Sequence, residues 1–312
     1  MEVEIGRGKK GRRAYGFDDI AIVPSRRTRD PDDIDITSMI GPYRLELPLL
    51  ASAMDGVVSP QTAGIVGKLG GLGVLNLEGI WTRYEDADEQ LERIAGQPKE
   101  LATTEMQRIY AEPIKEELIG QRIREIKDQG VVAAASLTPQ RVRTYHETAL
   151  EAGLDILVIQ GTVISAEHVS TRTEPLNLKE FIRELQDTVP IVVGGCASYA
   201  TGLHLMRTGA VGVLVGVGPG AACTTRGVLG IGVPQAKAFA MSPPLRMPPS
   251  ATTLTYCPVS SMCWEREAWT SAIAVACGTP MPSTPRVVHA APGPTPTRTA
   301  SAPVRMRWRP VA

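Results

Sequence analysis

Short apolar segments alternate with longer segments of mixed polarity between residues 45 and 217. Each apolar segment is an uninterrupted hydrophobic run, whereas a half-exposed strand would alternate apolar with polar residues. Uninterrupted runs are typical of parallel strands that are buried on both faces. The pattern therefore predicts six parallel strands, at 45–53, 71–77, 131–137, 154–161, 189–195 and 211–217.

The segments between these runs have the spacing of amphipathic helices. Ser59 and Pro60 suit the N-cap and first turn of a helix, and Gly70 and Gly71 suit its end. Regular alternation of strand and helix predicts an α/β protein with a parallel sheet. The apolar stripes that predict these helices are Ile65, Val66 and Leu69; Ile119, Ile123 and Ile126; and Leu178, Phe181, Ile182 and Leu185.

A closed barrel and an open doubly wound sheet both fit this alternation. An open sheet that binds a dinucleotide usually carries a G-x-G-x-x-G turn after its first strand. Residues 52–56 read S-A-M-D-G instead, which favours a (β/α)8 TIM barrel. We predict that this barrel is incomplete, with about six β/α units. The longer connection at 80–130, rich in Glu and Gln, is predicted to be a helical decoration too short for a separate domain.

The composition changes abruptly near residue 241. Residues 241–312 hold 13 of the 25 prolines and three of the four tryptophans but no lysine, and their acids are Glu265 and Glu267. Because proline interrupts helices and central strands, we predict a disordered tail. The tail is either a natural extension or the product of a shifted reading frame. In both cases two barrel strands would be missing and the barrel edges left unpaired.

The charges of the chain are balanced, with 33 basic and 33 acidic residues. No overall field favours nucleic acid or an anionic membrane, so small molecules are the expected partners. Residues 1–13 lack the apolar core of a signal peptide, and no apolar run has the roughly 18 residues of a membrane span, which predicts a cytoplasmic protein. The five cysteines and four histidines lack metal-ligand spacing, so we expect reduced thiols and no zinc site.

One cysteine has the surroundings of a nucleophile. Residues 215–226 read V-G-V-G-P-G-A-A-C-T-T-R, which places Cys223 on a glycine-rich loop after the last predicted strand. Glycines leave backbone amides and carbonyls uncovered for a bound ion, and loops at the carboxyl ends of strands hold the active sites of α/β barrels. Cys196 also follows a strand but has no such loop, so we assign it to core packing.

Four motifs, in order along the chain, resemble the IMP dehydrogenase and GMP reductase family. The connection at 80–130 lacks the CBS pair that many IMP dehydrogenases insert there, and so resembles the CBS-less relatives of high-GC bacteria. The motifs are 17–24, similar to F-D-D-V-L-L-V-P; 52–55, similar to S-A-A-M-D; 70–74, similar to G-G-I-G-V; and 218–226 with 232–235, similar to G-P-G-S-x-C-T-T-R and G-V-P-Q.

The resemblance implies oxidation of inosine monophosphate (IMP) to xanthosine monophosphate (XMP), a step of guanine nucleotide synthesis, with NAD as the hydride acceptor. Cys223 would attack C2 of the purine, because hydride leaves a tetrahedral carbon more easily than an aromatic one. A water that Thr225 helps to position would then hydrolyse the covalent thioimidate. Members of the family are usually tetramers, so a homo-oligomer is implied as well.

The resemblance also implies contacts with ligands. Ser52 matches a residue near the nucleotide phosphate, and Gly220 belongs to the loop that binds the substrate. The carbonyls of Gly218, Gly220 and Cys223 match a potassium-binding turn. The positions that correspond to cofactor contacts are Gly218, Gln160, Gly161 and Gly195.

Several of these positions differ from the family. Gln160 and Gly161 replace an Asp-Ser pair, Gly195 replaces an asparagine, and Ala221 replaces a phosphate-facing serine. The family's later I-A-D-G-G strand, its G-S strand and its Arg-Tyr flap have no counterpart after Met241. Two alternatives therefore stay open. One is a GMP reductase, which shares the cysteine loop but deaminates reductively with NADPH, and the other is an inactive nucleotide-binding or assembly subunit.

These observations divide the chain into three parts. Residues 1–44 are an N-terminal arm, 45–240 a partial catalytic barrel without a CBS insertion, and 241–312 a tail without a counterpart in the family.

Overall fold

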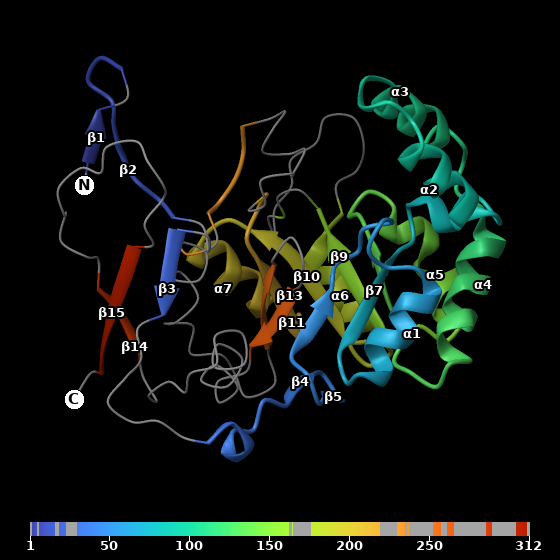
Figure 1. The fold of residues 1–312 in the computed structure, drawn as a ribbon. Helices are drawn as coiled ribbons and strands as arrows, with labels where there is room; N and C mark the ends of the chain where they lie inside the picture. Colours follow the sequence, from blue (N-terminus) through green and yellow to red (C-terminus); the bar gives the residue numbers. More distant parts are fainter. Residues whose placement is uncertain are drawn as a thin grey trace.

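Six parallel strands form one continuous curved wall in the computed structural model of the protein (Figure 1). They are β6 (Leu49–Ala51), β7 (Leu72–Asn76), β8 (Ala134–Leu137), β9 (Ile156–Gln160), β10 (Ile191–Cys196) and β11 (Gly212–Val215). Each coincides with one of the six predicted runs, which confirms the predicted strands. The structure describes residues 2–4, 6–15, 19–22, 30–161, 164, 176–218, 230–234, 236, 252–256, 261–264, 285–288 and 304–310.

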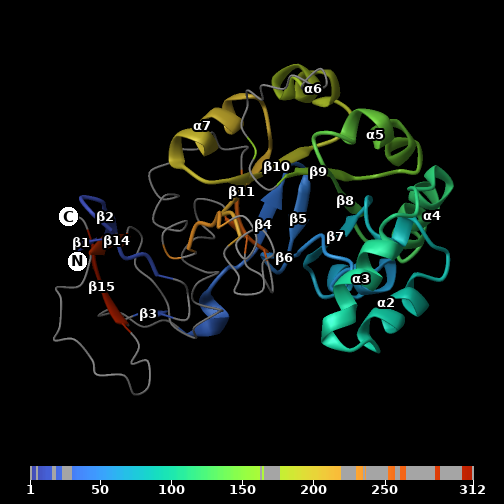
Figure 2. The ribbon, with the colours of Figure 1, turned by 90° about the horizontal axis from the view of Figure 1, so that it is seen from above.

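Helices cover the outside of this wall, as the view along the barrel shows (Figure 2). The five that connect consecutive strands are α1 (Pro60–Lys68), α4 (Glu116–Lys127), α5 (Val142–Glu151), α6 (Leu178–Leu185) and α7 (Tyr199–Arg207). The start of α1 agrees with the sequence signals: Ser59 accepts from the Thr62 N–H at 3.0 Å and the Thr62 hydroxyl accepts from the Ser59 N–H at 2.7 Å. Gly70, with φ +89°, then ends the turn after α1.

The connection from β7 to β8 is longer and helical, as predicted. It contains η3 (Ile80–Thr82), α2 (Ala87–Ala95) and α3 (Lys99–Ile109) before α4. We call residues 80–110 the α2–α3 excursion. Its start is fixed by Arg122 of α4, which is 6% exposed and donates to the carbonyls of Trp81 at 3.0 Å, Tyr84 at 3.1 Å and Glu85 at 2.8 Å.

Alternate residues of the wall face two apolar layers. Val74, Val158 and Leu214 belong to a cluster inside the barrel, whereas Leu75 and Ile159 belong to the larger cluster between the wall and its helices. This double burial is the physical reason for the uninterrupted hydrophobic runs. Apolar burial of this kind stabilises a fold by about 25 cal/mol for each Å² removed from water.

A hairpin closes the amino-terminal end of the barrel. Its strands, β4 (Ser38–Ile40) and β5 (Tyr43–Leu45), pair antiparallel, and Ile40 and Leu45 join the interior cluster. The Tyr43 hydroxyl donates to Asp155 at 3.2 Å, and Lys127 forms an ion pair with the same carboxylate at 2.8 Å. Earlier elements are the β1 (Glu2–Glu4) and β2 (Lys10–Arg12) hairpin, β3 (Ile20–Ile22) and η2 (Pro31–Asp33).

The closure of the barrel differs from the sequence-based prediction. The six predicted parallel strands are present, with five helices connecting them in the described residues, but the edges are not left open. β12 (Thr252–Tyr256) pairs parallel with β11, and β13 (Ser261–Trp264) pairs antiparallel with both β12 and β6, which closes the wall. The barrel is therefore not a regular (β/α)8 repeat, because an antiparallel pair supplies its last two strands.

The part of the chain predicted to be a disordered tail thus contains strands. Besides β12 and β13, β14 (Pro285–Val288) pairs with β15 (Val304–Pro310), and β15 pairs with β3. Proline density excludes long helices but permits short strands between prolines, so these four segments can pair as strands within a stretch of this composition. Within the described residues, no helix has the length and apolar character needed to cross a membrane.

The close packing of α1 on β7 gives a test of the fold. A Cβ atom at Gly73 would lie 2.6 Å from the Ala63 Cα. We expect Gly73→Ala to lower the free energy of unfolding by about 1–3 kcal/mol, because either α1 or β7 must shift to make room for the added methyl group. Gly56→Ala is the matched control, since a Cβ there meets no atom within 4 Å. Urea denaturation of both variants measures the difference, and equal stabilities would contradict the packing described.

Candidate active site

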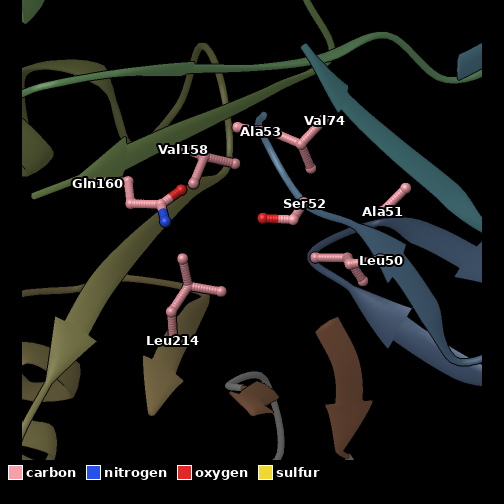
Figure 3. Close-up of a pocket in the computed structure, with 8 residues that line it drawn as sticks. All are labelled: Leu50, Ala51, Ser52, Ala53, Val74, Val158, Gln160 and Leu214. Atoms are coloured by element: carbon pink, nitrogen blue, oxygen red, sulfur yellow. The ribbon is translucent and has the colours of Figure 1, made fainter. Parts of the chain in front are cut away.

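A cavity lies inside the barrel, at the carboxyl ends of the strands (Figure 3). Its apolar floor comes from the interior cluster, and two polar side chains stand above that floor. About 240 Å³ of space lies between the lining side chains, part of it open to solvent. The part that is free for a water molecule is about 10 Å³, which is roughly the room that one water molecule needs. The lining residues are Leu50, Ala51, Ser52, Ala53, Val74, Val158, Gln160 and Leu214.

Ser52 and Gln160 are the polar residues of this lining. Ser52 directly follows β6 and is 4% exposed, and Gln160 is the last residue of β9. Figure 3 shows the Ser52 hydroxyl and the Gln160 amide both directed into the space between their strands. The hydroxyl can donate or accept a hydrogen bond and the amide can do both at once. The structure therefore brings together two of the predicted site residues, one from the predicted substrate set and one from the predicted cofactor set.

Gly161 and Gly195 meet through their backbones instead. The Gly161 N–H donates to the Gly194 carbonyl at 2.9 Å, and the Gly195 N–H donates to the Gly161 carbonyl at 3.2 Å. A Cβ atom at Gly195 would lie 2.3 Å from the Gly216 carbonyl oxygen. The ends of β9, β10 and β11 thus approach too closely for a side chain at position 195, and both backbone donors are already used.

The loop that carries the predicted nucleophile begins and ends at the same place on the barrel. Val217 and Val233 form an antiparallel bridge, in which the Val233 N–H donates to the Val217 carbonyl at 2.7 Å. Gly218, with φ +51°, is the last described residue before this loop. Gly220, Cys223 and Thr225 lie outside the described residues. The two ends of the segment are held beside β11, whose Leu214 lines the cavity.

Cys196 is part of the core, as its sequence context indicates. It is 1% exposed, and burial raises the pKa of its thiol to about 11. The thiolate is the nucleophilic form of cysteine, so this residue is unreactive at neutral pH. Among the residues that the structure describes, no group of His, Cys, Asp and Glu side chains is arranged to hold a metal ion.

A polar cluster next to Ser52 was missed by sequence reasoning. Asp55 is 8% exposed and accepts hydrogen bonds from the Asn76 amide, the Ile80 N–H and the Tyr110 hydroxyl. Burial raises the pKa of the Asp55 carboxyl. The sequence does contain a signal for Asp55, because this residue ends the S-A-M-D motif that follows a strand. It contains no signal for Tyr110, which lies 55 residues further along the chain.

Comparison with known proteins shows that residues 14–244 match the family described as the IMP dehydrogenase / GMP reductase domain. An uncharacterized oxidoreductase of Mycolicibacterium smegmatis is 46% identical over an alignment of 244 residues, and the match covers 76% of this chain and 64% of that protein. An inosine-5'-monophosphate dehydrogenase of Borreliella burgdorferi is 28% identical over 72% of this chain and 59% of its own length. The chain thus spans less than two thirds of the length of these relatives.

A solved structure shows a similar fold. The crystal structure of an IMP dehydrogenase/GMP reductase-like protein from Corynebacterium glutamicum superposes with a TM-score of 0.75 at 39% sequence identity. The match covers 89% of this chain and 74% of the other. The family match itself ends at residue 244, close to the change in composition at residue 241.

The backbone contact at Gly195 predicts which glycine tolerates a side chain. Gly195→Ala is expected to lower the free energy of unfolding by about 1–3 kcal/mol, because its Cβ must displace a backbone carbonyl. Gly161→Ala is the control, since its Cβ would lie 3.3 Å from the Ile164 Cγ1, a contact that a small shift of the Ile164 side chain relieves. Thermal or urea unfolding compares the two, and a stable Gly195→Ala protein would contradict the described junction.

The burial of Cys196 predicts its reactivity. At pH 8 the folded protein should leave Cys196 unmodified by iodoacetamide, because the pKa of about 11 keeps the thiol protonated. Peptide mass mapping before and after denaturation in guanidinium measures this. Rapid alkylation of Cys196 in the folded protein would contradict its placement in the core.

Proposed function

The chain belongs to the IMP dehydrogenase/GMP reductase family of oxidoreductases, and we propose that it oxidises IMP to XMP with NAD as the hydride acceptor. One observation carries this proposal. The segment with the G-P-G-A-A-C-T-T-R sequence has both ends held at β11, beside a cavity at the carboxyl ends of the strands. Active sites of barrel enzymes are built at this end.

The proposed reaction starts with the thiolate of Cys223. It adds to C2 of the purine and forms a C–S bond, which converts that carbon to a tetrahedral centre. Bound NAD would supply the acceptor for the hydride that leaves C2. Thr225 helps to orient a water molecule that attacks the remaining thioimidate, and hydrolysis breaks the C–S bond, releases XMP and restores the thiol.

The cavity supports nucleotide binding by its combination of surfaces. The apolar floor of Val74, Val158 and Leu214 suits the flat face of a base, and the Ser52 hydroxyl suits a phosphate or ribose oxygen. These assignments belong to the proposal, as does binding of potassium by the carbonyls of Gly218, Gly220 and Cys223. Association of several such barrels into a tetramer is a further part of it.

The residues also fit a nicotinamide cofactor in one respect. Gln160 directs a primary amide into the cavity, which can pair with the carboxamide of nicotinamide, and Gly161 and Gly195 leave the adjacent rim free of side chains. Gln160 would therefore hold the cofactor. The junction at Gly195 nevertheless excludes an asparagine, and this observation favours an inactive nucleotide-binding subunit as the second candidate.

Replacement of the nucleophile tests the proposal. We expect Cys223→Ala to lower XMP formation from IMP and NAD by more than about 10³-fold, because the covalent route is lost. Affinity for IMP, measured by calorimetry, should change little. Cys196→Ala is the matched control and should keep its turnover, since Cys196 lies in the core.

The readouts are the absorbance of NADH and a mass increment on the Cys223 peptide. Binding of IMP without turnover by the wild-type chain would favour the inactive subunit. Conversion of GMP to IMP with NADPH would favour the reductase. Turnover that survives Cys223→Ala would exclude the proposed nucleophile.

A further inference from the structure

The loop that presents Ser52 is held in shape by its own backbone. The Met54 N–H donates to the Ser52 carbonyl at 2.7 Å, and the N–H groups of Val57 and Val58 both donate to the Met54 carbonyl at 2.9 Å. The loop then enters α1 at Ser59. Three backbone hydrogen bonds over so few residues make a compact turn, so a shift at Asp55 would be transmitted to Ser52. We call residues 52–58 the Ser52 loop.

Asp55 anchors this loop to the next strand and to the start of the α2–α3 excursion. One carboxylate oxygen accepts from the Asn76 amide at 3.2 Å, and the other accepts from the Ile80 N–H at 3.0 Å. The backbone carbonyl of Asp55 accepts from the Trp81 indole at 3.3 Å. Gly79 makes room for this contact, because a Cβ there would lie 1.9 Å from the Asp55 carboxylate.

The far end of the excursion reaches the same carboxylate. Tyr110, which follows α3, donates its hydroxyl to the Asp55 oxygen that Ile80 also binds. Arg83 keeps this end in place: its guanidinium donates to the Glu78 carbonyl at 3.0 Å and to the Glu112 carbonyl, and it lies 5.8 Å from the centre of the Tyr110 ring. Burial and the neighbouring Asp55 raise the pKa of Tyr110, so the phenol remains a donor.

This contact is not explained by core packing. Tyr110 is 39% exposed, whereas the residues that fasten α3 by burial include Ile109, which is fully buried. The hydroxyl of Tyr110 is directed inward to a buried carboxylate while part of its ring faces solvent. A hydrogen bond to a charged acceptor is stronger than one between neutral groups, so a single bond can couple the two segments.

We propose that Asp55 and Tyr110 are positioning residues through which the α2–α3 excursion holds the Ser52 loop in its binding conformation. The inference rests on the proposed function for the identity of the ligand, a purine nucleotide. The excursion lies outside the barrel wall (Figures 1 and 2), so anything that displaces α3 would loosen the nucleotide site from outside. Asp55 and Tyr110 act through Ser52 and are not catalytic residues.

Hydrogen exchange of the full chain without ligand tests the proposal directly. Tyr110→Phe removes the donor but keeps the ring beside Arg83. We expect the amides of Met54, Val57 and Val58 to exchange about tenfold faster in this variant, because the loop opens locally more often. Tyr84→Phe is the matched control: the Tyr84 hydroxyl donates to the Ile109 carbonyl at 3.1 Å, so it fastens the same end of α3 without touching Asp55.

Unchanged exchange at these amides in Tyr110→Phe would overturn the inference. Equally fast exchange in Tyr110→Phe and Tyr84→Phe would also overturn it, because general loosening of α3 would then explain the effect. This result is independent of ligand binding. Failure of the wild-type chain to bind IMP would overturn the proposed function while the exchange data still decide the role of Tyr110.

Nucleotide affinity gives the second readout. Titration calorimetry with IMP should show a dissociation constant raised about three- to tenfold in Tyr110→Phe and unchanged in Tyr84→Phe. In turnover, KM for IMP should rise while kcat stays near the wild-type value, because Ser52 contributes the same binding before and during the reaction. If the wild-type chain binds IMP and Tyr110→Phe binds it with the same affinity, the inference is also overturned.

Discussion

The parallel wall from β6 to β11 is buried on both faces, and the rest of the structure depends on keeping it so. Helices cover its outer face, its own side chains fill the interior, and the β4–β5 hairpin closes the amino-terminal end. A parallel sheet cannot leave one face in water when both faces are apolar. The opposite end of the barrel is consequently the place where polar groups such as Ser52 and Gln160 meet.

Close backbone approach shapes this polar end. Where β9, β10 and β11 finish, glycine backbones take the space that side chains would otherwise occupy, and their donors are paired with one another. The result is a tight junction next to Val217, where the segment that contains Cys223 begins. The rim at this junction has fewer polar side chains, and Gln160 and Ser52 are the polar side chains that line the cavity beside it.

Support for the Ser52 loop comes from the wall and from helices outside it. Asp55 joins the loop to β7, to η3 and, through Tyr110, to the end of α3. A buried carboxylate is stable only when donors surround it, and here the donors come from three separate segments. The arrangement makes one side chain the meeting point of the barrel and the α2–α3 excursion.

Local patterns in the sequence determined the six strands, the cap at Ser59, the helical excursion and the family, because periodicity, capping and motifs act over a few residues. Ser52 and Gln160 could be chosen as site residues for the same reason. Tertiary structure decided what depends on distant segments: the closure of the barrel by β12 and β13, the exclusion of a side chain at Gly195 by Gly216, and the bond between Asp55 and Tyr110. Pairing of a strand edge, close contact of two backbones and solvation of a buried charge are set by neighbours in space, and no local pattern encodes them.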